Sequence, residues 1–271
     1  EITTMSLPER LINIPEIIFT YLKNFFFPIN LAINQQWVVR NVNFSLLAAD
    51  LLFFILLIWQ RSKEHFKLWL FFFIWFVLGL AFHLQIFPLD LTVSDRWFYL
   101  PIVGLLAMLV MTVRLNLVIV LFLLFLLAGR TWVREFDWRD GLTLYSHDIT
   151  ISKNAFDLEN NLGVELFRAG RISEAKVHFE ESIKLSPLWW TNWNNLGAVY
   201  EREGDLVKAQ EYYKKAIDNG QYYLAYENYV GILIKQEKYT EAKVFLDKEA
   251  LPRLPNNARL RQMWLSLYNH Q

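Results

Sequence analysis

The chain has 271 residues, of which 54% are hydrophobic and 17% aromatic, and its 27 basic side chains balance 27 acidic ones. A soluble domain is usually about 45–50% apolar, so this composition indicates a membrane segment. The absence of net charge disfavours an electrostatic nucleic-acid binder. Because the chain has no cysteine, disulfides, thiol nucleophiles and cysteine-based zinc sites are excluded.

The charges divide the chain into two parts. Residues 1–130 hold 7 acidic and 9 basic side chains, whereas residues 131–271 hold 20 and 18. The sequence therefore predicts an all-α protein, with a multispanning membrane helix bundle followed by a soluble α-solenoid. No signal-peptide pattern follows Glu1, so we expect none.

Residues 1–43 precede the membrane segments and have an amphipathic pattern. Their apolar side chains recur at helical spacing on one side, which favours a helix lying in the membrane interface. A fifth span interrupted by polar residues is the alternative. The apolar positions are Ile14, Ile17, Ile18, Tyr21, Leu22, Phe25 and Phe26.

Four apolar segments make residues 44–132 the predicted transmembrane region. A helix needs roughly 17–25 apolar residues to cross the hydrocarbon core, so one segment is long enough and the others must borrow flanking residues. A single helix over residues 97–129 would be about 50 Å long, so a turn is predicted at Arg114, Leu115 and Asn116. The segments are Phe44–Trp59, Leu68–Phe87, Trp97–Val113 and Leu115–Trp132, with a polar loop over residues 60–65.

The second part of the chain is a repeat with a period of 34 residues. The sequence Asn160–Gly163 recurs as Asn194–Gly197, and Gly170 and Gly204 keep the same spacing. A third copy keeps Gly231, but its Ala242 comes one residue early, which indicates a shortened turn. This period resembles the tetratricopeptide repeat, a pair of helices that buries its apolar face by stacking on neighbours.

The predicted repeat domain covers residues 133–271, with repeats at about 156–187, 190–221 and 224–254. Capping helices are expected at residues 140–152 and 256–268. The glycines at 163, 197 and 231 are expected to let helices approach closely. The residues predicted to pack the repeats are Leu162, Gly163, Ala175, Leu196, Gly197, Ala209 and Gly231.

Arrays of this kind generally bind a protein or peptide in their groove. Five aromatic side chains are candidates for groove contacts, and packing between repeats is the alternative for each. They are Trp189, Trp190, Tyr222, Tyr223 and Tyr226.

Three further segments carry a resemblance that covers most of the chain. They are Lys23–Leu31, Ser94–Pro101 with the following Ile102–Gly104, and Gly129–Tyr145. Together with the repeats, these segments resemble the transmembrane and tetratricopeptide-repeat O-mannosyltransferase-like family and its bacterial relatives. The resemblance implies a GT-C glycosyltransferase core, a polyprenyl- or dolichyl-phosphate sugar donor, and repeats on the extracytoplasmic (periplasmic or luminal) side.

That family has its catalytic acids in a loop after its first span, and nothing in this chain corresponds to that loop. We therefore expect this chain to be the C-terminal part of such a protein, with no catalytic residue and no activity alone. Arg96, beside Tyr99 at the mouth of a span, is the candidate for binding lipid phosphate, with interfacial anchoring as the alternative.

Asp50 lies within the first span and is a candidate because intramembrane acids are commonly functional. The alternative is a carboxyl group that is protonated or solvated near a span end. The five histidines lack metal-ligand spacing, so no metal site is predicted, and no phosphate-binding or nucleophile motif is present.

Three functions compete at this point. The first is the rear part of a lipid-phosphate-dependent glycosyltransferase whose repeats engage protein acceptors. The second is a membrane-anchored interaction module without catalysis, with membrane lipid and a protein or peptide as partners. The third, an O-antigen ligase or polymerase, requires a large loop between spans, and residues 88–96 are too few for one.

Overall fold

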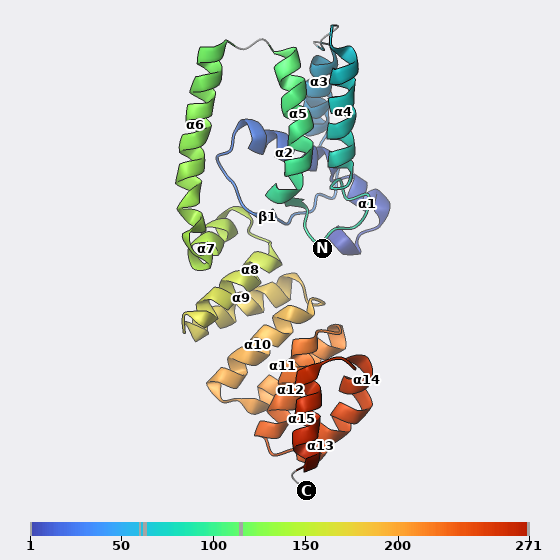
Figure 1. The fold of residues 1–271 in the computed structure, drawn as a ribbon, viewed down its shortest axis with the longest axis vertical. Helices are drawn as coiled ribbons and strands as arrows, with labels where there is room; N and C mark the ends of the chain where they lie inside the picture. The colour runs from blue at the N-terminus through green and yellow to red at the C-terminus, as the bar shows by residue number, and fades with distance from the viewer. Residues whose placement is uncertain (1, 60, 62–63, 114–115, 270–271) are drawn as a thin grey trace. The chain divides into compact units, whose positions relative to one another are not determined.

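The computed structural model describes residues 2–59, 61, 64–113 and 116–269, and these are helical apart from one short strand pair and the connecting segments (Figure 1). The chain divides into two compact units, one ending at Leu158 and the other beginning at Glu159. We call them the bundle unit and the repeat unit.

The bundle unit contains seven of the labelled helices and both short strands. The strands pair in antiparallel register, Asn34 with Ser94 and Gln35 with Val93. Short 3₁₀ turns precede α1, α5 and α7. The elements are α1 (Leu7–Leu11), α2 (Ile14–Phe26), β1 (Asn34–Gln35), α3 (Phe44–Trp59), α4 (Phe66–Ala81), β2 (Val93–Ser94), α5 (Tyr99–Thr112), α6 (Leu117–Glu135) and α7 (Gly141–Ile151).

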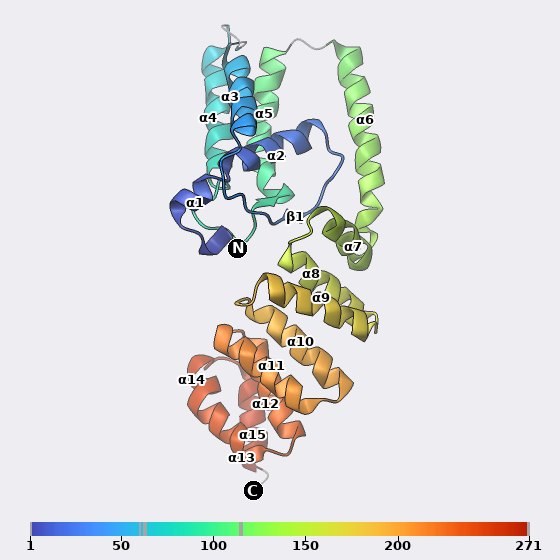
Figure 2. The ribbon, with the colours of Figure 1, turned by 180° about the vertical axis from the view of Figure 1, so that it is seen from behind.

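Helices α3, α4 and α5 lie side by side, whereas α6 stands apart from them in both views (Figures 1 and 2). Helix α5 approaches α4 closely because Gly104 has no side chain: an added Cβ would lie 2.6 Å from the Phe72 carbonyl oxygen. Phe76, Leu105 and Met108 fill the interior beside this contact and are fully buried. Helices α4 and α5 therefore share a closely packed core.

The helix ends differ from the predicted spans where polar side chains intervene. Helix α4 ends at Ala81, before the predicted Phe87, and Gln85 turns the chain with a φ of 60°. The buried Gln85 amide donates to the Leu91 carbonyl at 2.6 Å, which closes the turn. Asn116 caps α6 by accepting from the Val118 amide at 2.7 Å; the other two residues of the predicted turn, 114 and 115, lie outside the described residues, as do 60, 62 and 63 of the predicted loop.

The N-terminal segment is a helix only as far as Phe26. The apolar face of α2 is buried by protein, with Ile17 fully buried and Tyr21 stacked on Phe98 at a ring distance of 4.9 Å. The pattern that indicated an interfacial helix is thus also satisfied by packing on the bundle. Residues 28–39 form an extended segment, which the sequence did not predict.

The repeat unit stacks helices in pairs and ends in a further helix. Helix α8 begins at the boundary between the units. The elements are α8 (Phe156–Arg168), α9 (Ile172–Leu185), α10 (Trp190–Glu203), α11 (Leu206–Asn219), α12 (Tyr223–Lys235), α13 (Tyr239–Phe245), a π turn (Leu246–Ala250), α14 (Leu251–Arg253) and α15 (Ala258–Asn269).

Small residues bring the paired helices together in the first two repeats. A Cβ added at Gly163 would lie 2.7 Å from the Phe179 ring, and one added at Gly197 would lie 2.7 Å from the Tyr213 ring. Leu162, Ala175, Leu196 and Ala209 are buried as predicted. At Gly231, however, an added Cβ would meet nothing within 4 Å, so the prediction of close approach is wrong there.

The turns between paired helices need a left-handed residue. Gly170 and Gly204 have φ values of 78° and 84°, as the predicted turns require. In the third repeat Glu237 takes this conformation with a φ of 60°. Glu237 lies 33 residues after Gly204, so the turn comes one residue early, as the position of Ala242 predicted.

The two predicted capping helices have different outcomes. Helix α15 packs on the last repeat: the Trp264 indole and the Tyr268 hydroxyl both donate to the Asp247 carboxylate, at 2.6 and 2.5 Å. Helix α7, predicted to cap the other end, belongs instead to the bundle unit. Its Asp148 side chain is bound by bundle residues, so the division falls at Leu158 rather than at residue 133.

Candidate functional site

Asparagine side chains join the first helices of the three repeats into one layer. The Asn195 amide on α10 donates to Asn160 on α8 at 2.7 Å, and the Asn228 amide on α12 donates to Asn194 on α10 at 3.0 Å. Asn195 and Asn228 are half-buried, as is Asn161 on α8. The repeat of two adjacent asparagines, visible in the sequence, therefore forms a row of partly accessible amides across α8, α10 and α12.

Ion pairs that cross between repeats flank this row. Lys235 on α12 contacts the Glu201 carboxylate on α10 at 2.5 Å, and Tyr213 donates to the same carboxylate. Burial raises the pKa of the Tyr213 hydroxyl, and its hydrogen bond to Glu201 raises that pKa further. This hydroxyl therefore stays protonated. The asparagines themselves are neutral amides that both donate and accept hydrogen bonds.

Most of the aromatic groove candidates pack the repeats instead. Trp190 stacks on Tyr222 of the next repeat at a ring distance of 4.4 Å, and Tyr226 is fully buried. Trp189 is half-buried in the turn before α10, whereas Tyr223 is 50% exposed. The alternative of inter-repeat packing is confirmed for Trp190 and Tyr222, whereas Tyr226 stacks on Phe245 of its own repeat.

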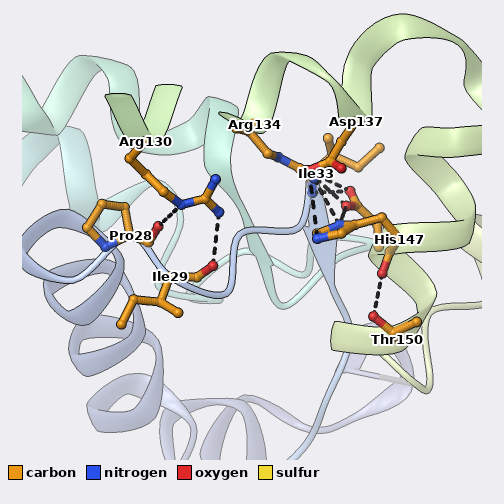
Figure 3. A network of polar contacts seen from close by, with 9 residues as sticks. Pro28, Ile29, Ile33, Arg130, Arg134, Asp137, His147 and Thr150 are labelled. Carbon is orange, nitrogen blue, oxygen red and sulfur yellow. Dashed lines mark hydrogen bonds and ion pairs between the residues drawn. The ribbon is translucent and has the colours of Figure 1, made fainter. Parts of the chain in front are cut away.

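A polar junction at the C-terminal end of α6 holds the bundle unit together (Figure 3). The Arg130 guanidinium donates to the carbonyls of Pro28 and Ile29, at 2.6 and 2.9 Å. One helical turn later, Arg134 donates to both oxygens of Asp148, at 2.9 and 3.1 Å. We call these side chains, with Asp137 and His147, the polar junction.

The Arg134–Asp148 pair is shielded from solvent and fully bonded. The Asp148 carboxylate has no exposed surface and also accepts the Ile33 backbone amide at 2.8 Å. The second terminal nitrogen of Arg134 donates to Asp137 at 2.9 Å and lies 2.9 Å from Nδ1 of His147, which is 2.7 Å from Asp148. A buried ion pair persists only when further hydrogen bonds satisfy it, and this one meets that condition.

The extended segment 28–39 exchanges hydrogen bonds with several distant parts of the bundle unit. The Gln36 backbone amide donates to the Ser152 hydroxyl at 3.2 Å, and the Gln36 side chain accepts the Phe156 amide at 3.1 Å. Asn34 donates to Asp157 at 2.6 Å; burial raises the pKa of Asp157, and the bond from Asn34 and the Arg96 charge oppose that rise. The first resemblance segment, residues 23–31, contacts each of the other two: its Pro28 and Ile29 carbonyls accept from Arg130, and its Phe25 ring lies 6.5 Å from that of Phe98.

The predicted lipid-phosphate residues lie at the surface near this place. Arg96 is exposed and makes no hydrogen bond or ion pair with the residues that the structure describes, and Tyr99 is 73% exposed. Arg96 therefore does not pair with the neighbouring Asp95. Both roles for Arg96 stay predictions.

Asp50 is buried within α3 rather than solvated at its end. Its side chain is 4% exposed, and both carboxylate oxygens are without a hydrogen-bond partner among the described residues. The described residues contain no group of three His, Asp or Glu side chains placed to hold a metal ion.

The repeats are supported by comparison with known proteins. Residues 191–219 match the tetratricopeptide repeat family. The chain is 35% identical over 81 residues to "Uncharacterized protein ycf37" of Pyropia yezoensis, covering 30% of this chain and 43% of that protein. It is 34% identical over 58 residues to the chloroplastic tetratricopeptide repeat domain-containing protein PYG7 of Arabidopsis thaliana, covering 21% and 19%. The chain thus spans less than half the length of these curated relatives.

Two solved structures are similar to this chain over less than half of its length. The Arabidopsis OM64 tetratricopeptide domain is 20% identical with a TM-score of 0.40, over 43% of this chain and 97% of that one. Pseudomonas aeruginosa PilF is 22% identical with a TM-score of 0.41, over 46% and 58%. The match over residues 191–219 agrees with the 34-residue period and with the stacked helix pairs of the all-α repeat unit.

Proposed function

We propose that the protein is a membrane-anchored interaction module, in which the bundle unit lies in a lipid bilayer and the repeat unit binds an extended polypeptide. The observation that carries the proposal is the contrast between an apolar, exposed α6 and a row of partly accessible asparagine amides on α8, α10 and α12. The first needs lipid, and the second offers hydrogen bonds to a ligand.

Helix α6 supports the membrane part of the proposal. It and the helix Asp95–Thr112 are long and apolar enough to cross a membrane, while α3 and α4 are apolar but shorter. Only 6% of Leu117–Glu135 is buried within the protein, so side chains such as Leu121, Phe122 and Phe125 are exposed. Soluble monomers rarely expose continuous apolar patches above a few hundred Å², and α6 presents apolar residues along several turns.

The asparagine row supports the binding part of the proposal. Solenoids of this kind bind ligands on an extended concave surface, and we place that surface on α8, α10 and α12, which the asparagines join. An amide side chain can donate to a peptide carbonyl and accept from a peptide amide. This chemistry fits the main chain of an extended polypeptide and places little demand on its side chains.

A random peptide library displayed on phage and selected on the full chain in lipid nanodiscs tests the binding part. We expect selected peptides to lose at least about tenfold in affinity, or 1.4 kcal/mol, when Asn195 and Asn228 are both changed to Ala. The exposed Lys184→Ala is the matched control and should bind like wild type. Selected peptides that bind the double variant unchanged would contradict the proposed groove.

The side of the membrane is a second, separable part of the proposal. The family resemblance supports placing the repeats on the extracytoplasmic side. Ser182 is fully buried, so a single cysteine at the exposed Lys184 is the better probe. It should react with a membrane-impermeant thiol reagent added from that side, and protection until the membrane is breached would contradict this orientation.

The glycosyltransferase interpretation and its lipid-phosphate sugar donor stay predictions of the resemblance. The interaction module is the function that the repeats support directly. Sugar transfer would need a carboxylate base at the acceptor hydroxyl, and the resemblance gives that role to no residue of this chain.

A further inference from the structure

We infer that the end of the bundle unit around Arg130 lies at the lipid headgroup level, and that α2 and α6 meet the membrane boundary at one shared depth. This inference rests on the proposed membrane anchoring and adds which surface contacts the headgroups. The ligand is the interfacial layer of a bilayer, where amphipathic aromatic rings and cations are favoured.

The composition of α6 changes sharply at its C-terminal end. Its first twelve residues, 117–128, are entirely apolar, and the chain then reaches Gly129, Arg130, Trp132 and Arg134. Trp132 is 66% exposed, and its ring lies 5.9 Å from that of Phe136, which is also exposed. A run of apolar residues followed by exposed aromatic and basic residues is the order expected on leaving the hydrocarbon core for the interface.

A second group of exposed apolar side chains lies at the end of α2. Phe27 and Ile29 are 66% and 72% exposed, whereas Ile17, Tyr21 and Leu22 of α2 are buried. The adjacent Lys23 is exposed as well. These residues follow one another where the helix gives way to the extended segment.

Arg130 holds the exposed side chains at the end of α2 and those at the end of α6 at the same depth. Its guanidinium donates to the Pro28 and Ile29 carbonyls (Figure 3), so the α2 end and the α6 end are joined side by side. Non-helical backbone is costly near hydrocarbon because its polar groups lack water. Pro28 has no amide hydrogen to satisfy, and Arg130 satisfies the two neighbouring carbonyls, which makes this exit from a helix tolerable at the membrane boundary.

Because the sequence has no cysteine, a spin label can be attached at one introduced cysteine without removing others. Single cysteines replacing Phe27, Trp132, Phe125 or Val177 carry a nitroxide, with the full chain in phosphatidylcholine–phosphatidylglycerol nanodiscs. The accessibility of each label to oxygen, relative to a nickel chelate, reports its depth. We expect the ratio to be highest at Phe125, lowest at Val177 of the repeat unit, and intermediate and equal at Phe27 and Trp132.

Each result decides something different. Ratios at Phe27 and Trp132 as low as that at Val177, with a high ratio at Phe125, overturn the headgroup surface but keep the membrane anchor. A low ratio at Phe125 overturns the anchor itself. Spin–spin broadening at Phe27 or Trp132 would show that a second copy covers this surface instead of lipid, and would also overturn the inference.

A substitution of Arg130 gives an independent test of the shared depth. Arg130→Ala should shift the Phe27 label towards the nickel chelate while leaving the Phe125 label unchanged, because only the α2 end is released. Arg139→Ala removes a guanidinium that is 75% exposed and should shift neither label. An unchanged Phe27 label in the Arg130→Ala protein would show that the two ends do not share their depth through Arg130.

Discussion

The two units of this chain are stabilised in opposite ways. The repeat unit buries small and aromatic residues between paired helices and leaves its ion pairs at the surface. The bundle unit exposes much of its apolar surface and buries its principal ion pair, Arg134–Asp148, at the end of α6. This difference is what the proposed membrane anchoring expects, because in lipid apolar surface is tolerated and polar groups must be satisfied internally.

The largest expected effect comes from breaking the buried pair in the bundle unit. Asp148→Ala leaves one terminal nitrogen of Arg134 and the Ile33 amide without their acceptor, and removing one partner of a buried pair costs about 3–5 kcal/mol. Thermal unfolding of the full chain in detergent micelles should show this as a large fall in the midpoint. Arg139→Ala, which breaks the exposed pair with Asp140, is the control and should leave the midpoint nearly unchanged.

The packing of the repeat unit is tested at its glycines. Gly197→Leu forces a side chain into the Tyr213 ring, and overpacking of this kind costs typically about 1–3 kcal/mol. Gly231→Ala is the matched control because its Cβ would meet no neighbour, and we expect a gain of roughly 0.5–1 kcal/mol from the lower entropy of the unfolded chain. Chemical denaturation followed by circular dichroism measures both; equal losses would show that the repeats do not differ in packing.

The sequence predicted the helices and repeats well because their periods are local signals. The α3 bounds, the buried Leu162 and Ala175, and the turns at Gly170 and Gly204 all follow from spacing along one or two helices. The extended segment 28–39 could not be predicted, since its hydrogen bonds join residues that are far apart in the sequence, such as Ile33 with Asp148 and Asn34 with Asp157. The prediction for Gly231 was wrong because the glycine recurs at the repeat spacing, but no aromatic ring faces it as Phe179 faces Gly163 and Tyr213 faces Gly197.

The shortened third turn offers a smaller gain. Glu237 adopts a left-handed conformation that costs a residue with a side chain roughly 1–2 kcal/mol. Glu237→Gly should therefore raise the stability of the repeat unit by about 1 kcal/mol, as measured by the denaturation midpoint. The corresponding Glu203→Gly, in an ordinary helical residue before Gly204, should lower it, and a fall in both would refute strain at Glu237.

The smallest expected effect is on the pH dependence of a helix cap. Asp205 accepts the Lys208 amide at the start of α11, and this hydrogen bond lowers the pKa of its carboxyl. A lowered pKa means that the cap stabilises the fold above the unfolded-state value and loses that contribution as the pH falls through the folded value. Asp205→Asn keeps the cap without the charge, so its midpoint should fall less steeply below about pH 4; an identical slope would exclude Asp205 as the source.

The central claim is that the bundle unit lies in lipid while the repeat unit does not. Alkaline carbonate extraction of native membranes, followed by flotation, compares the full chain with residues 156–271 expressed alone. The claim predicts that the full chain floats with the lipid after extraction and that residues 156–271 stay in the aqueous fraction. Release of the full chain by carbonate, or flotation of residues 156–271, would contradict it.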